Sequence, residues 1–139
     1  MNPDLKITGK NSDKSRKNNQ QMMKKIAYDT SLVEQMSRGN RDFVVQILQV
    51  FTEDAPLALE KIRDGMQRGD MQKVRSEAHS LKSSVKLLQV QGLTETVISI
   101  EELADSGGDK EGLRKQVDKL SEDLPLLIEQ ILNDIKGSP

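Results

Sequence analysis

From Ile26 onward, the apolar residues of the chain recur at intervals of three and four, which is the spacing of one face of an α-helix. No stretch alternates apolar and polar residues between turn residues, as a half-buried β-strand would. The pattern therefore predicts an all-α body. The full length of 139 residues fits one compact domain rather than two.

Four long apolar stripes are separated by short turns that contain glycine. Four such helices can bury their stripes by packing antiparallel, up-down-up-down, around one core. Residues 26–139 are therefore expected to form a four-helix bundle. The expected buried positions are, in chain order, Phe43, Ile47, Phe51, Ala55, Ala58, Ile62 and Met66; Val74, Ala78, Leu81, Val85 and Leu88; Leu93, Val97, Ile100 and Ala104; and Leu113, Val117, Leu120, Leu124, Leu127, Ile131 and Ile135.

Residues with capping side chains mark the expected helix ends. Ser31 followed by Glu34 resembles a capping box, which predicts a short N-terminal lid helix that stops at Gly39. Gly92 is expected to end the connection after the second stripe. The N-caps expected for three of the long helices are Asn40, Asp70 and Asp109.

Residues 1–25 differ from the body in composition and charge. They hold seven Lys or Arg against two acidic residues, and too few apolar side chains to offset the entropy of ordering. We interpret them as a flexible basic tail or linker. They contain no apolar run long enough for a signal peptide, and no later segment reaches membrane-spanning length. The chain has no cysteine, so a cytoplasmic location without membrane insertion is expected.

His79 is the only histidine in the chain. It follows the expected core residue Ala78 by one position, which turns it about 100° away from the buried stripe of its helix. The imidazole is therefore expected to be exposed, among cations and one small residue. The neighbours on that flank, at positions i−4, i+3, i+4 and i+7, are Arg75, Lys82, Ser83 and Lys86.

These surroundings favour a phosphoryl carrier. Neighbouring positive charge disfavours imidazolium, keeps one ring nitrogen free as a nucleophile, and stabilises the phosphate once it is bound. Lys82 is the best-placed cation, and the small side chain of Ser83 would let another protein approach. A partner can supply the metal ion and the aspartate, because phosphoryl transfer needs mainly positioning and charge compensation.

The carboxylates of the chain suggest no further chemistry. Asp70 and Glu77 share a helix with His79 but are poorly spaced to bond to it. Glu101, Glu102 and Asp105 are expected to form a solvated helix face, and no metal site is predicted.

The run Ala78-His79-Ser80-Leu81-Lys82-Ser83-Ser84 resembles the signature of the histidine phosphotransfer (HPt) family, Ala-His-x-Leu-Lys-Gly followed by small residues. Upstream, Asp42-Phe43-Val44 through Phe51, with Pro56 and then Gly69-Asp70, is similar to that family's layout. The resemblance covers most of Tyr28 to about Ser106. Two positions depart from it, because Ser83 and Gln89 stand where the family usually has glycine.

The resemblance implies a four-helix bundle that accepts a phosphoryl group on His79 from a receiver-domain aspartate and donates it to another receiver. Lys82 would be the cation on the phosphate side. The receivers, in response regulators or hybrid histidine kinases, would bring Mg²⁺, and this chain would bind no cofactor. It would be a phosphotransfer intermediate rather than an enzyme, since no Gly-rich phosphate loop is found.

Partner docking is expected around the histidine, on Arg75, Lys86 and Gln89, and one bundle is expected to act as a monomer. Two alternatives stay open. The chain could be a non-transferring helical adaptor, in which His79 is incidental. It could also be a nucleic-acid or membrane-surface protein that uses the basic tail, although 2% aromatic residues leave few stacking platforms for bases.

Overall fold

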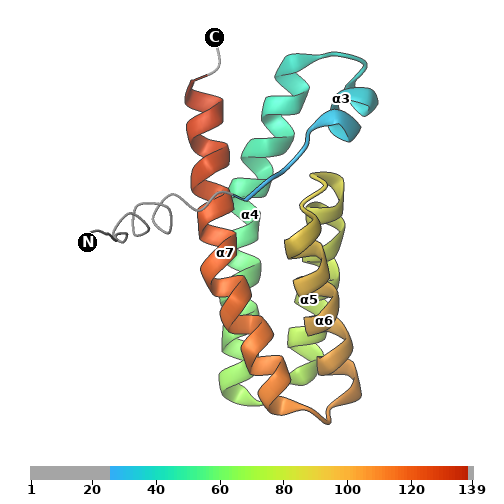
Figure 1. Ribbon diagram of the computed structural model, residues 1–139, viewed down its shortest axis with the longest axis vertical. Coiled ribbons are helices and arrows are strands. Elements are labelled where there is room, and N and C mark those ends of the chain that lie inside the picture. The colour runs from blue at the N-terminus through green and yellow to red at the C-terminus, as the bar shows by residue number, and fades with distance from the viewer. Residues whose placement is uncertain (1–25, 138–139) are drawn as a thin grey trace, which may run out of the picture.

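The computed structural model describes residues 26–137, so the predicted basic tail of residues 1–25 lies outside the described part. Within residues 26–137 all regular elements are helices, which confirms the predicted all-α fold (Figure 1). The helices are α3 (Ser31–Ser37), α4 (Arg41–Arg68), α5 (Met71–Leu87), α6 (Gln91–Ser106) and α7 (Lys110–Lys136).

The four long helices form a closed antiparallel bundle. Each packs against its neighbour in sequence, and α7 returns to pack against α4 (Figure 1). Because the connections are only a few residues long, successive helices must run in opposite directions. The predicted bundle with a short N-terminal helix is therefore confirmed.

Glycines and capping side chains mark where these helices end and begin. Gly69 and Gly107 end α4 and α6 with φ angles of 69° and 71°, a left-handed conformation that glycine adopts without strain. At three helix starts a side-chain oxygen accepts the backbone N–H three residues further on, at 2.8–3.2 Å, and the residues are the predicted Asn40, Asp70 and Asp109.

The start of α3 differs from the predicted capping box. The N-cap is Thr30, and Ser31 is already the first helical residue. The carboxylate of Asp29 accepts the Ser31 N–H at 2.8 Å, and the Thr30 hydroxyl donates to Glu34. The prediction that Ser31 caps the helix is wrong, because the helix begins one residue earlier than expected and Asp29 accepts the N–H of its first residue.

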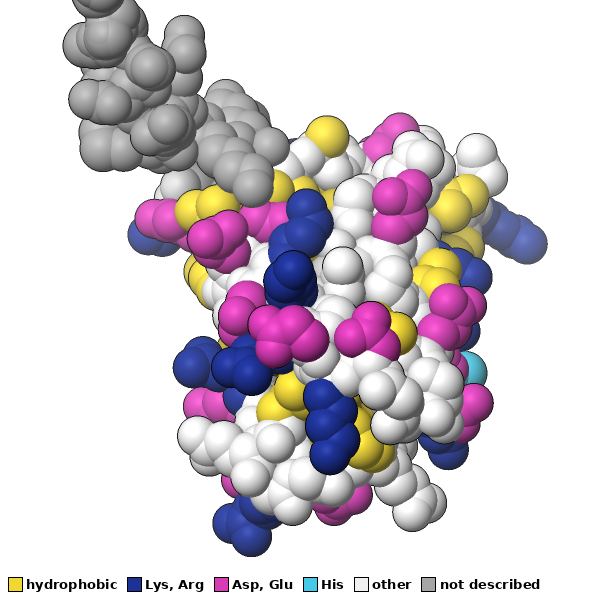
Figure 2. Space-filling view, turned by 60° about the horizontal axis from the view of Figure 1, so that its bottom comes forward, with side chains coloured by type: hydrophobic (Ala, Val, Ile, Leu, Met, Phe, Trp, Pro, Cys, Tyr) yellow, Lys and Arg dark blue, Asp and Glu magenta, His cyan; other side chains and the backbone are white. Residues whose placement is uncertain are grey.

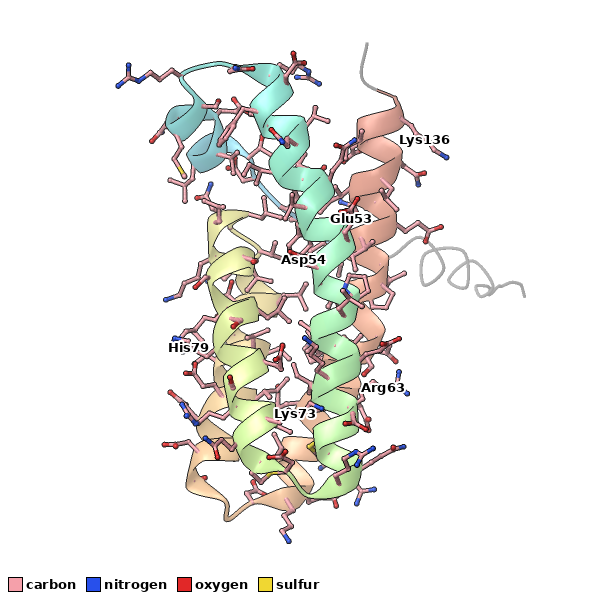
Figure 3. All side chains as sticks on the ribbon, turned by 180° about the vertical axis from the view of Figure 1, so that it is seen from behind. Glu53, Asp54, Arg63, Lys73, His79 and Lys136 are labelled. Carbon is pink, nitrogen blue, oxygen red and sulfur yellow. The ribbon has the colours of Figure 1, made fainter. Side chains whose placement is uncertain are left out.

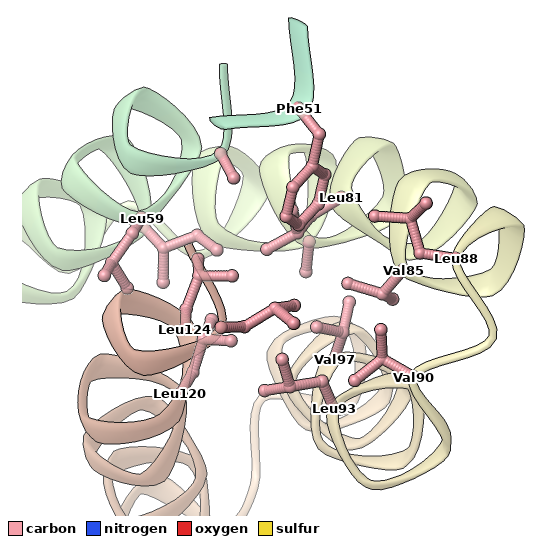
Figure 4. Packing of buried hydrophobic residues seen from close by; sticks show 14 of the residues in the cluster. Phe51, Leu59, Leu81, Val85, Leu88, Val90, Leu93, Val97, Leu120 and Leu124 are labelled. Atoms are coloured by element: carbon pink, nitrogen blue, oxygen red, sulfur yellow. The ribbon is translucent and has the colours of Figure 1, made fainter. Parts of the chain in front are cut away.

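Three of the four predicted stripes are confirmed. Every predicted position on α5 is buried, including Leu88 just after its end, and so is every predicted position on α6. On α7 every predicted position is buried except Ile135, which is half-buried. Side chains from all four helices meet in one core (Figure 4). No helix within residues 26–137 is long and apolar enough to cross a membrane.

The stripe predicted for α4 is wrong in part. Phe51, Ala55 and Ile62 are buried as expected, but Phe43 is exposed and Ile47, Ala58 and Met66 are only half-buried. The buried face instead includes Val44, Leu48, Leu59 and Gly65. The reason is that α4 contacts α5 on one side, α7 on the other and α3 near its start, so its buried face is wider than one narrow stripe.

The short helix α3 covers one end of the bundle. With 28 and 27 residues, α4 and α7 are much longer than α5 and α6, which have 17 and 16. At 1.5 Å per residue α4 is about 16 Å longer than α5. In Figure 1 α3 lies above the ends of α5 and α6, and its Val33 is fully buried.

Residues 26–30 lead into α3 and are tied to both sides of the bundle. The Asp29 N–H donates to the Leu88 carbonyl at 2.8 Å. The side-chain amide of Gln130, on α7, bonds both backbone groups of Ile26, at 3.1 and 2.8 Å. This end of the bundle is therefore closed by ordered backbone.

Candidate functional site

His79 lies on α5 with its side chain directed away from the core. Ala78, one position earlier, is fully buried, whereas the His79 side chain is 62% exposed. Figure 3 shows His79 on the outer side of α5, and Figure 2 shows the single histidine at the molecular surface, next to acidic side chains. The exposure predicted from the 100° offset is confirmed.

A carboxylate from the neighbouring helix holds His79 in place. Oε2 of Glu101, on α6, lies 2.7 Å from Nδ1 of His79. The other oxygen, Oε1, lies 2.8 Å from Nζ of Lys82. The side chains of Glu101 and Lys82 are only 17% and 24% exposed, so both are much more buried than the imidazole. We call these three residues the His79–Glu101–Lys82 cluster.

The charges of this cluster decide which ring nitrogen is available. The hydrogen bond from Lys82 lowers the pKa of Glu101 most, and the hydrogen bond from His79 lowers it further. This side chain is therefore a carboxylate at neutral pH. A carboxylate only accepts hydrogen bonds, and Nδ1 must therefore carry the proton that is shared with it. In the neutral form of the ring the lone pair is then on Nε2, and within residues 26–137 Nε2 has no hydrogen-bond partner.

The expected solvated face of α6 is wrong at Glu101, because this side chain is only 17% exposed and bonds to His79. The two residues are far apart in sequence, but the antiparallel α5–α6 pair brings them together. His79 and Glu101 lie eleven residues before and after Val90, at the turn, and Arg75 and Asp105 lie fifteen before and after it. This symmetry about the turn is the sequence signal that could have found the pair.

The remaining predicted site residues are placed as follows. Lys82 is in the cluster, and Ser83 is exposed one helical turn after the histidine. Nε of Arg75 lies 3.7 Å from Oδ1 of Asp105, and both side chains are well exposed. Lys86 is exposed on the same helix.

Gln89, a predicted docking residue, lies in the α5–α6 turn and bonds within the chain. Its φ of 54° is left-handed, and its side chain donates to the Ser31 hydroxyl at 3.0 Å. The prediction that Gly92 ends this turn is wrong, because α6 already begins at Gln91. Gln89 therefore takes the left-handed position of the turn.

An open groove lies between α4 and α5, beside the histidine. It has a volume of about 410 Å³. Val50 and Leu57 on its α4 side are 48% and 54% exposed, while Ser80 and Ser84 line its α5 side. Ser80 follows His79 by one position, which turns it about 100° around α5, so the groove lies on the flank of α5 next to the exposed face that carries the imidazole.

Residues 26–137 contain no group of three or more His, Cys, Asp or Glu side chains arranged to hold a metal ion. The carboxylate of the cluster is already engaged by two nitrogen donors. The exposed part of the cluster is thus one imidazole, with one lysine ammonium bound to the same carboxylate.

Comparison with known proteins places this arrangement in a family. A family model described as the Hpt domain matches residues 46–135, a stretch that includes His79, Lys82 and Glu101. Neither the curated proteins nor the solved structures gave a match. Because the matched stretch is well over half of the chain, the protein belongs to the Hpt domain family, whose members act in phosphotransfer within phosphorelays and interact with receiver domains.

Proposed function

We propose that this chain accepts a phosphoryl group on Nε2 of His79 from the aspartyl phosphate of one receiver domain and passes it to the aspartate of another. One observation carries the proposal. The imidazole is exposed, its Nδ1 is held by Glu101, and its Nε2 has no hydrogen-bond partner within residues 26–137. A nucleophile on a protein surface suits a reaction whose other half lies on a partner protein.

In the proposed transfer step, each bond that forms is matched by one that breaks. The Nε2 lone pair forms the N–P bond while the P–O bond to the receiver aspartate breaks, and that bonding pair leaves with the carboxylate. The ring keeps its Nδ1 proton and becomes positively charged. Lys82 would face the phosphoryl oxygens, and the Mg²⁺ would come with the receiver, because this reaction needs positioning and charge compensation more than covalent assistance.

The groove between α4 and α5 supports docking of a receiver next to the histidine. Its exposed Val50 and Leu57 offer apolar contact area, and Asp54, Lys61 and Glu77 provide charged groups among its lining residues. Ser80 and Ser83 are exposed on α5, one and four positions after His79. Their small side chains would leave room for the partner's active site to reach Nε2. Arg75 and Lys86 would lie at the rim. One bundle would act alone, because its four long helices bury their stripes against one another.

The test is a two-step transfer assay. A receiver carrying labelled aspartyl phosphate is incubated with the chain and Mg²⁺, and a second receiver is then added. We expect acid-labile, base-stable label on the chain and its passage to the second receiver. The His79→Gln variant, with the same fold by circular dichroism, should carry none. Absence of label on the original chain across several cognate receivers would instead favour the non-transferring adaptor.

A further inference from the structure

Arg75 and Lys82 flank His79 on α5. They lie four positions before and three positions after the histidine, so each stands about one helical turn from it, on the same side of the helix. Lys82 is bound within the cluster, with Nζ at 2.8 Å from Oε1 of Glu101. Arg75 has a different partner, because its Nε lies 3.7 Å from Oδ1 of Asp105 on α6. The two cations nearest to the imidazole in sequence are therefore held by different carboxylates.

The ion pair between Arg75 and Asp105 is loose and exposed. At 3.7 Å its two atoms lie beyond ordinary hydrogen-bond distance, unlike the contact between Lys82 and Glu101. The side chains of Arg75 and Asp105 are 41% and 75% exposed. An exposed ion pair adds little to stability, because water screens both charges. Arg75 can therefore leave Asp105 at small cost.

We propose that Arg75 is a phosphate-binding residue of the phosphorylated chain, which leaves Asp105 and bonds to the phosphoryl oxygens on Nε2 of His79. The inference rests on the proposed function, since it concerns the phosphohistidine that this function creates. Asp105 is then a competitor, which holds the guanidinium while the histidine is free.

Phosphorylation changes the balance of charge around Arg75. The phosphoryl group brings about 1.5–2 negative charges and three acceptor oxygens to a ring that stands one helical turn from Arg75. A planar guanidinium presents paired N–H donors that match two phosphate oxygens, and charge-assisted pairs of this kind are stronger than a loose contact with an exposed carboxylate. The guanidinium therefore gains more from the phosphoryl group than it loses at Asp105.

Two cations can share the phosphoryl oxygens without competing. One of the three N–H donors of Lys82 is directed to Glu101, which leaves two for the phosphate. Arg75 approaches from the opposite direction along the helix axis. Lys86, the next cation on this side of α5, follows His79 by seven positions, about 10 Å along the axis, and is farther from the ring than either.

The equilibrium of transfer separates phosphate binding from receiver docking. A residue that only contacts the receiver cannot change the equilibrium constant between the free proteins, because it contributes nothing once they separate. Arg75→Gln should shift this constant toward the phosphorylated receiver about fivefold, since a hydrogen bond to a charged group contributes more than an exposed ion pair. Asp105→Asn, which removes the competitor, should shift it about twofold toward the phosphorylated chain.

Arg114→Gln is the matched control for these variants. Nη2 of Arg114 lies 3.4 Å from Oε1 of Glu111, and both side chains are exposed, but this pair is on α7. The control therefore loses an exposed arginine and its ion pair away from the histidine helix. Its equilibrium constant should equal that of the original chain.

A second measurement detects the exchange of partners without any receiver. Phosphoramidate can phosphorylate the full chain, because its P–N bond breaks and ammonia leaves as the bond from P to Nε2 of His79 forms. Arginine Nε–H signals are recorded by ¹⁵N NMR before and after this treatment. The Arg75 signal, identified by its absence in Arg75→Lys, should shift on phosphorylation, whereas the Arg114 signal should not.

An unmoved Arg75 signal, or the same equilibrium constant in Arg75→Gln and Arg114→Gln, would overturn the inference. If a receiver phosphorylates His79 and either of these results is found, the inference alone fails. If phosphoramidate phosphorylates His79 and the Arg75 signal shifts, but no cognate receiver transfers, the proposed function alone fails. If His79 accepts a phosphoryl group from neither donor, both fail together.

Discussion

At the scale of single residues, Gln89 has an unfavourable backbone conformation that its side chain offsets. Its φ of 54° costs a residue with a Cβ about 1–2 kcal/mol relative to glycine. Its amide donates to the Ser31 hydroxyl at 3.0 Å, with the Asp29 carbonyl at 3.5 Å. The glutamine thus links the α5–α6 turn to the start of α3, which a glycine cannot do.

This balance predicts different effects for two substitutions of Gln89. Gln89→Ala keeps the left-handed strain and loses the hydrogen bond, so it should lower the free energy of unfolding by about 1 kcal/mol. Gln89→Gly loses the same bond but relieves the strain, so it should unfold at nearly the original urea concentration. Urea unfolding followed by circular dichroism measures both. A glycine variant less stable than the alanine variant would contradict this explanation.

The residues of the candidate site differ in how far the sequence could predict them. His79 and Lys82 are three positions apart on one helix, so helical geometry alone places them together. Glu101 is on another helix, and its contact depends on the register between α5 and α6. That register depends on where the turn lies, and Gly92 is the wrong turn residue. A one-residue error in a turn rotates a helix by about 100°, enough to hide such a pair.

At the scale of the elements, prediction succeeds where a helix has one buried face. The stripes of α5, α6 and α7 are narrow, and the sequence predicts them almost residue by residue. The stripe of α4 is broader because this helix packs against three others. One of its buried positions is Gly65, where an added Cβ would lie 2.8 Å from Cγ2 of Val74. A glycine contributes no apolar signal to a stripe, so the close approach of α4 and α5 there is visible only in the structure.

At the scale of the whole molecule, two of the open apolar grooves of the bundle lie on different sides of it. One lies between α4 and α5 beside the histidine, and includes Leu57. The other, between α4 and α7, includes Leu132. The two leucines are similarly exposed, at 54% and 43%, but only the first lies in a groove that α5, the helix of His79, also lines.

A charge placed in each groove should therefore have different effects on receiver binding. Leu57→Glu should weaken the affinity of the chain for its receiver about tenfold, since one apolar side chain buried in an interface contributes about 1.5–3 kcal/mol. Leu132→Glu should leave it unchanged. Isothermal titration calorimetry with the cognate receiver compares them. Equal loss in both variants, or none in Leu57→Glu, would exclude the α4–α5 groove as the docking surface.

As a phosphoryl carrier, the whole bundle would use one reactive atom, Nε2 of His79. The most direct test is ³¹P and ¹⁵N NMR of the full chain after incubation with a phosphorylated receiver and Mg²⁺. We predict a single phosphoryl group bonded to Nε2, with the proton retained on Nδ1. A phosphoryl group on Nδ1 or on another residue, or none at all, would contradict the account.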